Sequence, residues 1–215
     1  MNQADIQNIR SEYLTASLSE SDTNADPIKQ FDKWFNEALK AEVSEPTAMT
    51  LATATSDGRP SARIVLLKGF NSDGFVFYTN YLSRKGKEIG KNPLGSLLFF
   101  WAGLERQVRI EGVIEKVSRE DSEQYFHSRP RASQLGAIAS PQSQEIADRN
   151  ILEKKFNEVD AQYGDQEIPK PSFWGGYILK PRLIEFWQGR SSRLHDRILY
   201  KKIDNKNWKK VRLAP

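Results

Sequence analysis

Residues 48–79 read AMTLATATSDGRPSARIVLLKGFNSDGFVFYT, and this stretch indicates how the chain folds. Turn-forming groups, Ser56-Asp57-Gly58 and Asn71-Ser72-Asp73-Gly74, separate runs whose composition favours strands. Those runs are Ala48–Ala54, Ser61–Lys68 and Phe75–Thr79. Short strands joined by tight turns predict an antiparallel meander.

The pattern continues on both sides of this meander. We expect further strands at Leu94–Trp101, Arg106–Val117, Phe173–Leu179, Arg182–Trp187, Arg193–Lys202 and Trp208–Leu213. We expect helices from Asp26-Pro27 to about Glu45, from Ser83 to about Lys91, from Ser118 through His127, and from Gln142-Ser143 to about Gln162. Roughly eight strands with helices inserted between them, rather than alternating with them, predict an antiparallel barrel of α+β class.

The composition excludes several kinds of chemistry. The 215 residues are 38% apolar, enough for one core, and 32 Lys and Arg against 28 Asp and Glu give a net charge of +4. That mild excess suits anionic small molecules at least as well as nucleic acid. With no cysteine and two histidines, we expect no disulfide, no thiol catalysis and no protein metal site, which favours an organic cofactor.

The N-terminal region is expected to be an arm rather than part of the barrel. Ile6, Ile9 and Tyr13 lie at helical spacing, and the polar stretch Ser17–Asn24 follows them. We therefore predict a mobile arm over residues 1–24 and a single domain over residues 25–215. Neither a signal-peptide core nor an apolar run near the ~20 residues of a membrane span is found, so a cytoplasmic protein without membrane contact is expected.

A group of cations is expected near the start of one helix. Ser83 is a suitable N-cap, which places Arg84 and Lys85 in the first turn, where positive side chains oppose the helix dipole. A bound phosphate would compensate for this and would meet free backbone N–H groups. Arg63 on a nearby strand could add a third charge, whereas Lys68, at an odd offset from it, would face another ligand group. The alternative is that Lys85 is simply solvated.

A second phosphate site is predicted from the four-residue spacing of Tyr125, Arg129 and Ser133. If helical geometry continued through Pro130, the three side chains would share one face, and their polar groups would suit phosphate oxygens. The residue before a proline avoids the helical conformation, which counts against a continuous helix.

A third group of basic residues lies in the run Glu185-Phe-Trp-Gln-Gly-Arg-Ser-Ser-Arg-Leu-His-Asp-Arg197. If the segment from Arg193 onward is a strand, Arg193, His195 and Arg197 line one of its faces. Three such groups repel one another unless an anionic or electron-rich ligand lies against them. The alternative is a solvated strand face with Asp196 or Glu185 nearby.

A series of short motifs runs through the chain in a fixed order. They are Arg63-Ile-Val-Leu-Leu-Lys68, Phe77-Tyr-Thr-Asn80 with Ser83-Arg-Lys85, Asn92-Pro93 to Trp101, Glu105-Arg-Gln107, Tyr125-Phe-His-Ser-Arg-Pro130, Ser172-Phe-Trp-Gly-Gly176, Glu185-Phe-Trp-Gln-Gly189 and Arg193-Leu-His-Asp-Arg197. Their order and spacing resemble the pyridoxine/pyridoxamine 5'-phosphate oxidase family over nearly the whole chain. The resemblance implies an antiparallel split β-barrel with flanking helices, and a homodimer with FMN at its interface.

The resemblance also implies a reaction of vitamin B6 biosynthesis. Pyridoxine or pyridoxamine 5'-phosphate would be oxidised to pyridoxal 5'-phosphate, with hydride passing from substrate C4' to flavin N5 and O2 reduced to H2O2. Contacts with FMN are implied for Arg63, Ile64, Val65, Leu66, Leu67, Lys68, Tyr78, Thr79, Arg84, Lys85, Gln107, Gln142, Ser143, Trp187 and Arg197. In this family Gln142 and Ser143 would reach one flavin from a different chain than Arg84 and Lys85.

Contacts with the substrate are implied for Arg10, Tyr13, Lys68, Tyr125, Arg129, Ser133, Arg193 and His195. Arg193 and His195 would lie over the pyridine ring, hold the substrate hydroxyl or amine and help its deprotonation. Arg10 and Tyr13 match the arm that covers the substrate. Where many members have Asp before Pro-Thr-Ala-Met, this chain has Glu45, so that carboxylate is given no role.

Two alternatives belong to other functional classes. Another split-barrel flavoprotein, such as a flavin reductase, could keep the FMN residues, but it has no need for the substrate set Tyr125, Arg129, Ser133, Arg193 and His195. A nucleic-acid-binding barrel could use the basic charge and the five tryptophans. The aromatic residues, however, fall mainly at core spacing rather than among Lys and Arg on one face, and no nucleic-acid partner is expected.

Overall fold

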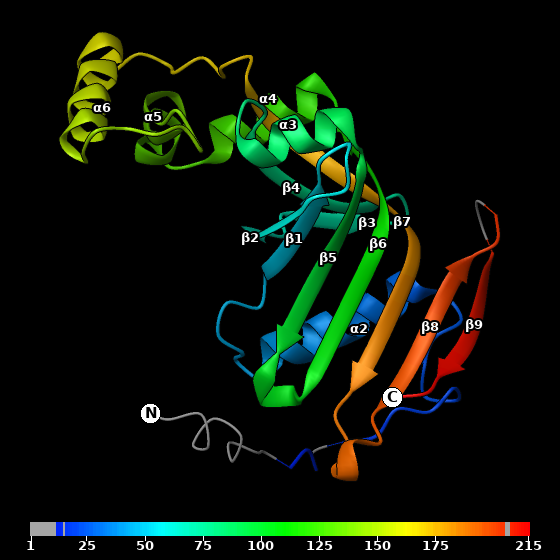
Figure 1. Ribbon diagram of the computed structural model, residues 1–215. Helices are drawn as coiled ribbons and strands as arrows, with labels where there is room; N and C mark the ends of the chain where they lie inside the picture. Colours follow the sequence, from blue (N-terminus) through cyan, green and yellow to red (C-terminus); the bar gives the residue numbers. More distant parts are fainter. Residues whose placement is uncertain (1–11, 15, 205–206) are drawn as a thin grey trace, which may run out of the picture. The chain divides into compact units, whose positions relative to one another are not determined.

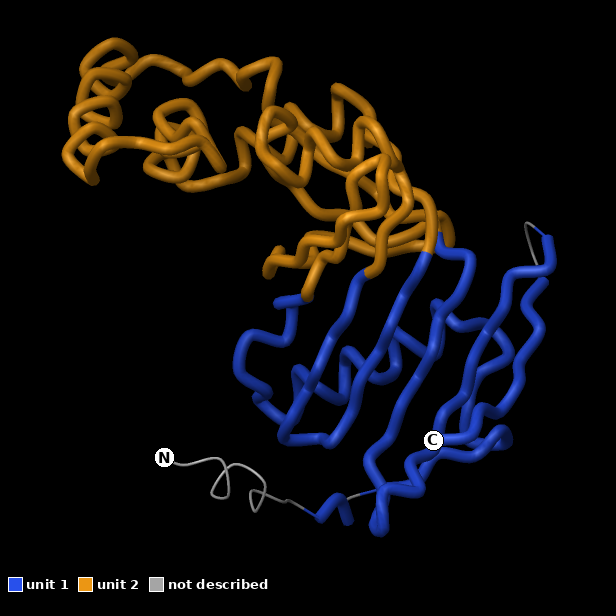
Figure 2. Tube along the Cα trace, in the orientation of Figure 1, with its two compact units in different colours: residues 1–49, 97–111, 181–215 blue, residues 50–96, 112–180 orange. Residues whose placement is uncertain are grey.

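The computed structural model describes residues 12–14, 16–204 and 207–215. The described chain divides into two compact units, which are coloured separately in Figure 2. Unit 1 comprises Met1–Met49, Leu97–Glu111 and Pro181–Pro215, and unit 2 comprises Thr50–Ser96 and Gly112–Lys180. Arg10 and half of the predicted arm, residues 1–11 and 15, lie outside the described residues, so the predicted division into an arm and one domain stays a prediction.

The described residues form nine strands in one sheet (Figure 1). The strands are β1 (Ala48–Ala54), β2 (Pro60–Leu66), β3 (Gly69–Asn71), β4 (Gly74–Asn80), β5 (Leu94–Trp101), β6 (Arg106–Lys116), β7 (Trp174–Gln188), β8 (Asp196–Lys202) and β9 (Trp208–Leu213). Their order is β2-β1-β5-β6-β7-β4-β3, with β8 paired to β7 and β9. The pairings of β4 with β3 and β7, and of β8 with β7 and β9, are antiparallel, as expected from the turn-rich sequence.

Helices connect or flank these strands. They are α2 (Pro27–Lys40), α3 (Arg84–Lys91), α4 (Arg119–Ser128), α5 (Arg131–Ala139) and α6 (Asn150–Tyr163), with short 3-10 turns at Ala102–Leu104 and Ser191–Arg193. The predicted caps are confirmed for three of them. Asp26 Oδ1 accepts the Ile28 N–H at 2.8 Å, the Ser83 hydroxyl accepts the Gly86 N–H at 3.3 Å, and the Ser118 hydroxyl accepts the Asp121 N–H at 2.9 Å.

Each unit has its own aromatic packing. In unit 1, Phe31 and Trp34 of α2 are buried; the Phe31 ring lies 5.2 Å from Phe99, and the Trp34 ring lies edge-on, 5.2 Å from Phe186. The last buried residue of α2 is Ala38, and the next residue, Leu39, is 46% exposed. In unit 2, a core cluster is formed by Phe126, Leu135, Val159, Ile168 and Trp174.

The expected break in the strand at Pro181 and the expected start of the longest C-terminal helix were wrong. The segments on either side of Pro181 form one strand, β7, rather than two. The register explains why proline is tolerated: β4 pairs with β7 only up to Leu179, and β8 pairs from Leu183 onward, so the missing N–H of Pro181 falls between the two pairings. Helix α6 begins at Asn150, where Asp148 Oδ1 accepts the Asn150 N–H at 2.7 Å, and not after Gln142-Ser143.

Substitutions at two glycines of α3 test how closely this helix packs against Tyr81. A Cβ at Gly86 would lie 2.2 Å from the Tyr81 carbonyl oxygen, whereas nothing lies within 4 Å of a Cβ at Gly90. We expect Gly86→Ala to destabilise the protein by about 1–3 kcal/mol through overpacking. Gly90→Ala should stabilise it by about 0.5–1 kcal/mol, because alanine favours helix and restricts the unfolded chain. Urea denaturation measures both, and equal effects of the two substitutions would contradict the close seating of α3 on Tyr81.

Candidate functional site

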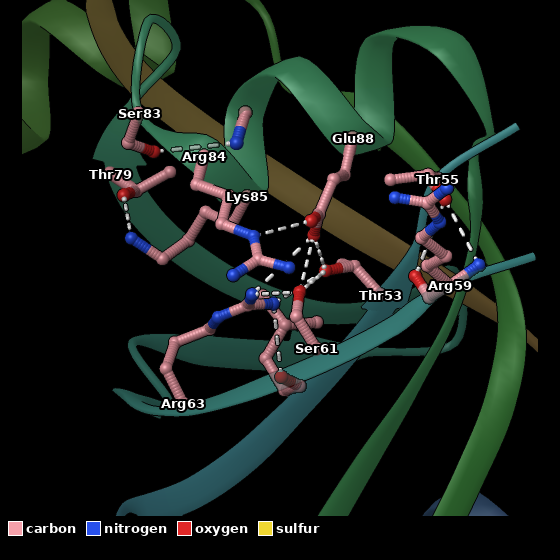
Figure 3. Close-up of polar contacts among 12 residues, drawn as sticks. Thr53, Thr55, Arg59, Ser61, Arg63, Thr79, Ser83, Arg84, Lys85 and Glu88 are labelled. Atoms are coloured by element: carbon pink, nitrogen blue, oxygen red, sulfur yellow. Dashed lines mark hydrogen bonds and ion pairs between the residues drawn. The ribbon is translucent and has the colours of Figure 1, made fainter. Parts of the chain in front are cut away.

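A buried carboxylate organises the first group of cations, all of it in unit 2 (Figure 3). Glu88 of α3 is 5% exposed, and its Oε2 accepts hydrogen bonds from Thr53 Oγ1 at 2.5 Å and Ser61 Oγ at 2.6 Å. Arg84, one helical turn earlier, donates its Nε–H to Oε1 at 2.9 Å, and Arg63 Nη2 lies 3.4 Å from Oε2. The carboxylate therefore holds two guanidinium groups from β2 and α3 side by side.

The charge of Glu88 persists in spite of its burial. Burial raises the pKa of this carboxyl, but hydrogen bonds from Ser61, Thr53 and Arg84 and the charge of Arg63 outweigh it, and the pKa falls to about 2. Burial lowers the pKa of the Arg63 guanidinium, an effect that the Glu88 carboxylate opposes. The group is thus a charged network rather than a set of neutralised side chains.

Lys85 completes this group and is not the solvated lysine of the alternative interpretation. Its side chain is 9% exposed, and its Nζ donates to Thr79 Oγ1 at 3.2 Å and to Gln142 Oε1 at 2.9 Å. Burial and the nearby Arg63 both lower the pKa of Lys85. Three cations and one carboxylate leave a net charge of +2, which is equal and opposite to the charge of a phosphate monoester dianion. The residues present therefore fit a phosphate group.

Gln142 and Ser143 lie near these cations within a single chain. Gln142 contacts Lys85 directly, and Ser143 lines a hollow of about 500 Å³ together with Leu82, Arg84 and Glu88. Gln142 thus lies beside Lys85 of its own chain, and the expectation that Gln142 and Ser143 reach one flavin from a different chain than Arg84 and Lys85 stays a prediction. Of the other predicted FMN residues in unit 2, Ile64, Val65 and Leu66 lie on β2, and Leu67 and Lys68 follow that strand. Tyr78 and Thr79 lie on β4.

A second group in unit 2 is built on parallel aromatic rings. The Tyr125 ring stacks on Tyr78 with centroids 3.9 Å apart, and Trp174 lies nearly parallel to both, with centroids 5.6 Å from Tyr78 and 6.2 Å from Tyr125. Arg129 Cζ lies 4.6 Å above the Trp174 ring. Lys68 lines a hollow of about 410 Å³ with Tyr78 and Tyr125, so it lies with the predicted phosphate residues rather than with Arg63.

The helix does not continue through Pro130. Helix α4 ends at Ser128, Arg129 adopts an extended conformation (φ −76°, ψ 149°), and Ser133 lies on the separate helix α5. Tyr125 and Arg129 meet through Trp174, not through a shared helix face. Arg129 Nη1 is buried, and none of the described residues accepts a hydrogen bond from it. A buried guanidinium N–H without an acceptor is costly, so this atom marks a place for an anionic ligand.

Unit 1 contains the remaining predicted residues, and here one expectation was wrong. Strand β8 begins only at Asp196; Ser191–Arg193 forms a 3-10 turn, and Arg193 has a φ of 60°. Arg193, His195 and Arg197 therefore do not line one face of a strand. The glycine-like backbone at Ser192 and Arg193 turns the chain before β8 can start.

Arg197 is held by a buried carboxylate, as the alternative interpretation for this segment proposed. Glu185 is 2% exposed and accepts from Arg197 Nε at 2.8 Å and Nη2 at 3.1 Å; Arg109 also donates to it. Burial raises the pKa of Glu185, but hydrogen bonds from Arg197 and Arg109 outweigh this effect. The net result is a lowered pKa, so the carboxylate remains charged. Arg197 Nη1 also donates to the Ala214 carbonyl at 2.9 Å.

His195 is held with a defined ring orientation. Its Nδ1 accepts the backbone N–H of Arg190 at 3.1 Å, and its ring lies 4.6 Å from Trp187 and 5.8 Å from Tyr13. Because Nδ1 is an acceptor, a neutral His195 carries its proton on Nε2. Gln107 lies on β6 of the same unit. Of the two arm residues predicted to contact the substrate, Tyr13 is among the described residues and Arg10 is not.

Sequence reasoning missed three residues that hold the others in place: Glu88, Glu185 and Trp174. Glu88 follows Arg84 by four residues, a spacing that predicts an ion pair on a helix. Glu185 was considered only as a neighbour of a solvated strand, and Trp174 only as part of a motif.

None of the helices in the described residues is long and apolar enough to cross a membrane.

Comparison with known proteins identifies the family. Residues 35–163 match the model for pyridoxamine 5'-phosphate oxidase, and residues 174–215 match that for the pyridoxine 5'-phosphate oxidase C-terminal dimerisation region. Curated pyridoxine/pyridoxamine 5'-phosphate oxidases from Leptospira interrogans and Herminiimonas arsenicoxydans are 57% and 58% identical over 210 residues. These matches cover 98% of this chain and 98% and 99% of the relatives.

Solved structures agree on the fold. The chain superimposes on PhzG from Burkholderia lata 383 with a TM-score of 0.88 and 33% identity, covering 94% of this chain and 100% of that one. A pyridoxamine 5'-phosphate oxidase-related, FMN-binding protein from Nostoc punctiforme gives a TM-score of 0.69 at 20% identity, over 90% of this chain and 100% of that one, and shares the fold. The predicted antiparallel split barrel is confirmed, and the chain belongs to the pyridoxine/pyridoxamine 5'-phosphate oxidase family of oxidoreductases.

Proposed function

We propose that this protein oxidises pyridoxine 5'-phosphate or pyridoxamine 5'-phosphate to pyridoxal 5'-phosphate with FMN as its cofactor. The observation that carries the proposal is the presence in unit 2 of two separate cationic groups that lack sufficient negative charge. One has a net charge of +2 around Glu88, and the other contains the unpaired Nη1 of Arg129. A flavin phosphate and a substrate phosphate would supply the two missing anions.

FMN is the cofactor that this reaction requires: when bound, it accepts a hydride from substrate C4' at N5 and passes the electrons to O2, which becomes H2O2. Arg63, Arg84 and Lys85 would hold its phosphate through charge-assisted hydrogen bonds. The remaining residues of the proposed FMN set are Ile64, Val65, Leu66, Leu67, Lys68, Tyr78, Thr79, Gln107, Gln142, Ser143, Trp187 and Arg197.

The substrate phosphate would be bound by Lys68, Tyr125, Arg129 and Ser133. Tyr13, Arg193 and His195 would surround its pyridine ring, and Arg10 would belong to the same covering segment. In this arrangement binding and orientation supply most of the catalysis, since the hydride must leave C4' in a fixed geometry. The Nε2–H of a neutral His195 donates a hydrogen bond to a substrate oxygen or amine, so His195 orients the substrate rather than removing a proton through Nε2.

The C-terminal residues 174–215 match a dimerisation region, which supports a homodimer. We propose in addition that FMN binds at the dimer interface. A cytoplasmic location, the lack of a nucleic-acid partner and the division into an arm and one domain stay predictions from the sequence.

The proposed reaction is tested by anaerobic reduction of the bound flavin. We expect the purified protein to be yellow and to lose its flavin absorbance when pyridoxine 5'-phosphate is added without O2. Admission of O2 should restore the absorbance and yield one pyridoxal 5'-phosphate and one H2O2 for each substrate. Unphosphorylated pyridoxine at the same concentration is the control and should react far more slowly. An FMN-loaded protein that neither phosphorylated vitamer reduces would overturn the proposal.

The proposed flavin phosphate site predicts a preference for FMN over riboflavin. Lys85→Met should weaken FMN binding by about 1.5–3 kcal/mol, roughly 10–150-fold, because one charge-assisted contact with the phosphate is lost. Riboflavin affinity, measured by quenching of flavin fluorescence, should not change. The matched control is Lys29→Met on the exposed face of α2, which removes the same charge and should affect neither ligand. Equal losses for FMN and riboflavin would argue that Lys85 supports the fold and not the phosphate.

The ring orientation of His195 predicts its tautomer. The chain has two histidines, so a 15N spectrum of the histidine rings contains two spin systems, and the variant His127→Gln assigns them. At pH 8 we expect the His195 Nδ1 to show the shift of an unprotonated nitrogen and Nε2 that of an N–H. A spectrum with the proton on Nδ1 would be incompatible with the hydrogen bond from Arg190 and would restore His195 as a candidate base.

A further inference from the structure

We propose that Trp174 is a positioning residue for the substrate phosphate: its indole face holds the Arg129 guanidinium while its ring plane supports Tyr125. This inference rests on the proposed function, because it assigns to Arg129 and Tyr125 the phosphate of the substrate. It adds a residue outside the proposed FMN and substrate sets, and it explains how Tyr125 near the end of α4 and Arg129 just beyond it are held in position.

The position of Trp174 is fixed by the fold of unit 2. It is the first residue of β7, is 6% exposed, and packs in the core cluster with Phe126 and Leu135. The next two residues are glycines that allow neighbouring side chains to come very close. A Cβ at Gly175 would lie 2.2 Å from the Tyr81 hydroxyl, and one at Gly176 would lie 2.6 Å from a Val117 methyl group. The strand start, and with it the indole ring, therefore has little freedom to move.

Arg129 is immobilised from several sides. Pro130 favours its extended backbone, and Gln134 Nε2 donates to its carbonyl at 2.8 Å. Its Cζ lies 4.6 Å from the centroid of the Trp174 ring and 5.7 Å from that of Phe126. Both distances are in the range of a cation–π interaction, so the two aromatic residues restrict the guanidinium without using its N–H groups.

The kind of interaction matters for an anion site. No carboxylate pairs with Arg129 among the described residues, in contrast to Arg63 and Arg84, which share Glu88. Burial lowers the pKa of Arg129, and the neighbouring Tyr125 raises it. A carboxylate would hold the guanidinium more strongly, but it would also compete with a phosphate for the same N–H donors. The π face of Trp174 attracts the cation without using its N–H groups as donors to a competing carboxylate.

Trp174 also aligns Tyr125, the second side chain proposed to bind the substrate phosphate. Its ring plane is within 5° of that of Tyr125 and within 14° of that of Tyr78. The three rings form a near-parallel set in which a shift of Trp174 would disturb Tyr125 and Arg129 together. A smaller aliphatic residue at this position would leave space into which both could relax.

The test compares Trp174→Leu and Trp174→Phe in the FMN-loaded enzyme. We expect Trp174→Leu to raise KM for pyridoxine 5'-phosphate about 5–30-fold, in line with the loss of a desolvated cation–π contact, while kcat changes less than about 2-fold. Trp174→Phe keeps an aromatic face and should restore most of the affinity. The matched control is Trp208→Leu on β9, whose ring lies 5.6 Å from Lys202 Nζ, and it should leave KM unchanged. A fall in kcat without a change in KM would overturn the proposal.

A double-mutant cycle separates positioning from general loss of structure. Binding of 4-deoxypyridoxine 5'-phosphate, which has no oxidisable group at C4', is measured by calorimetry for Trp174→Leu, Arg129→Met and the double variant. If Trp174 acts through Arg129, Trp174→Leu weakens binding in the wild-type background and has a clearly smaller effect beside Arg129→Met. Additive effects, or an equal loss for the analogue without phosphate, would show that Trp174 acts only through the core.

The two proposals can fail separately. A wild-type protein that binds the phosphorylated analogue but does not oxidise pyridoxine 5'-phosphate would contradict the proposed reaction and leave the role of Trp174 measurable. A wild-type protein that oxidises the substrate normally, with variants at Trp174 that bind the analogue as tightly as the wild type, would contradict the role of Trp174 alone.

Discussion

Strand β7 is the element that supports Arg129 in unit 2 and Arg197 in unit 1. Its first half pairs with β4 and begins with Trp174, and its second half pairs with β8 and carries Glu185 and Trp187. Pro181 fits only because the two pairings leave it free on that edge. The glycines after Trp174 let Tyr81 and Val117 pack against the strand itself. The backbone of one strand thus fixes an aromatic support in unit 2 and a buried carboxylate in unit 1, and the side chains with chemistry are arranged around these two points.

The protein holds its arginines in two physically different ways. Glu88 and Glu185 bind guanidinium groups through buried ion pairs, which fix geometry strongly but use N–H donors and charge. Trp174 and Phe126 hold Arg129 through their ring faces and leave its donors free. Arg106 combines both, since it lies over Trp34 and also pairs with Glu37, and it was not among the predicted site residues. The side chain that supports an arginine therefore sets how many of its N–H donors remain for a ligand.

Local sequence features predicted much of the fold. The strands at Ala48–Ala54, Leu94–Trp101 and Trp208–Leu213 and the caps at Asp26 and Ser83 were correct, because alternation, turns and capping act over a few residues. The continuity of β7 and the late start of β8 could not be predicted, since they depend on pairing with distant strands and on positive φ angles at Ser192 and Arg193. For the site, the convergence of Arg63, Arg84 and Lys85 was correct as geometry. The residues that hold the site together were missed, because a buried carboxylate or indole acquires its role only through contacts far apart in the sequence.

The buried Glu88 has a consequence for the order in which this protein is assembled. In many small metal-binding domains the ligating groups repel or remain unsatisfied without the ion, so folding waits for it. Here one carboxylate, whose pKa falls to about 2, pairs with two of the three clustered cations and offsets one of their three positive charges without any phosphate. The chain itself therefore supplies part of the charge compensation at this site, and a phosphate bound afterwards would supply the rest.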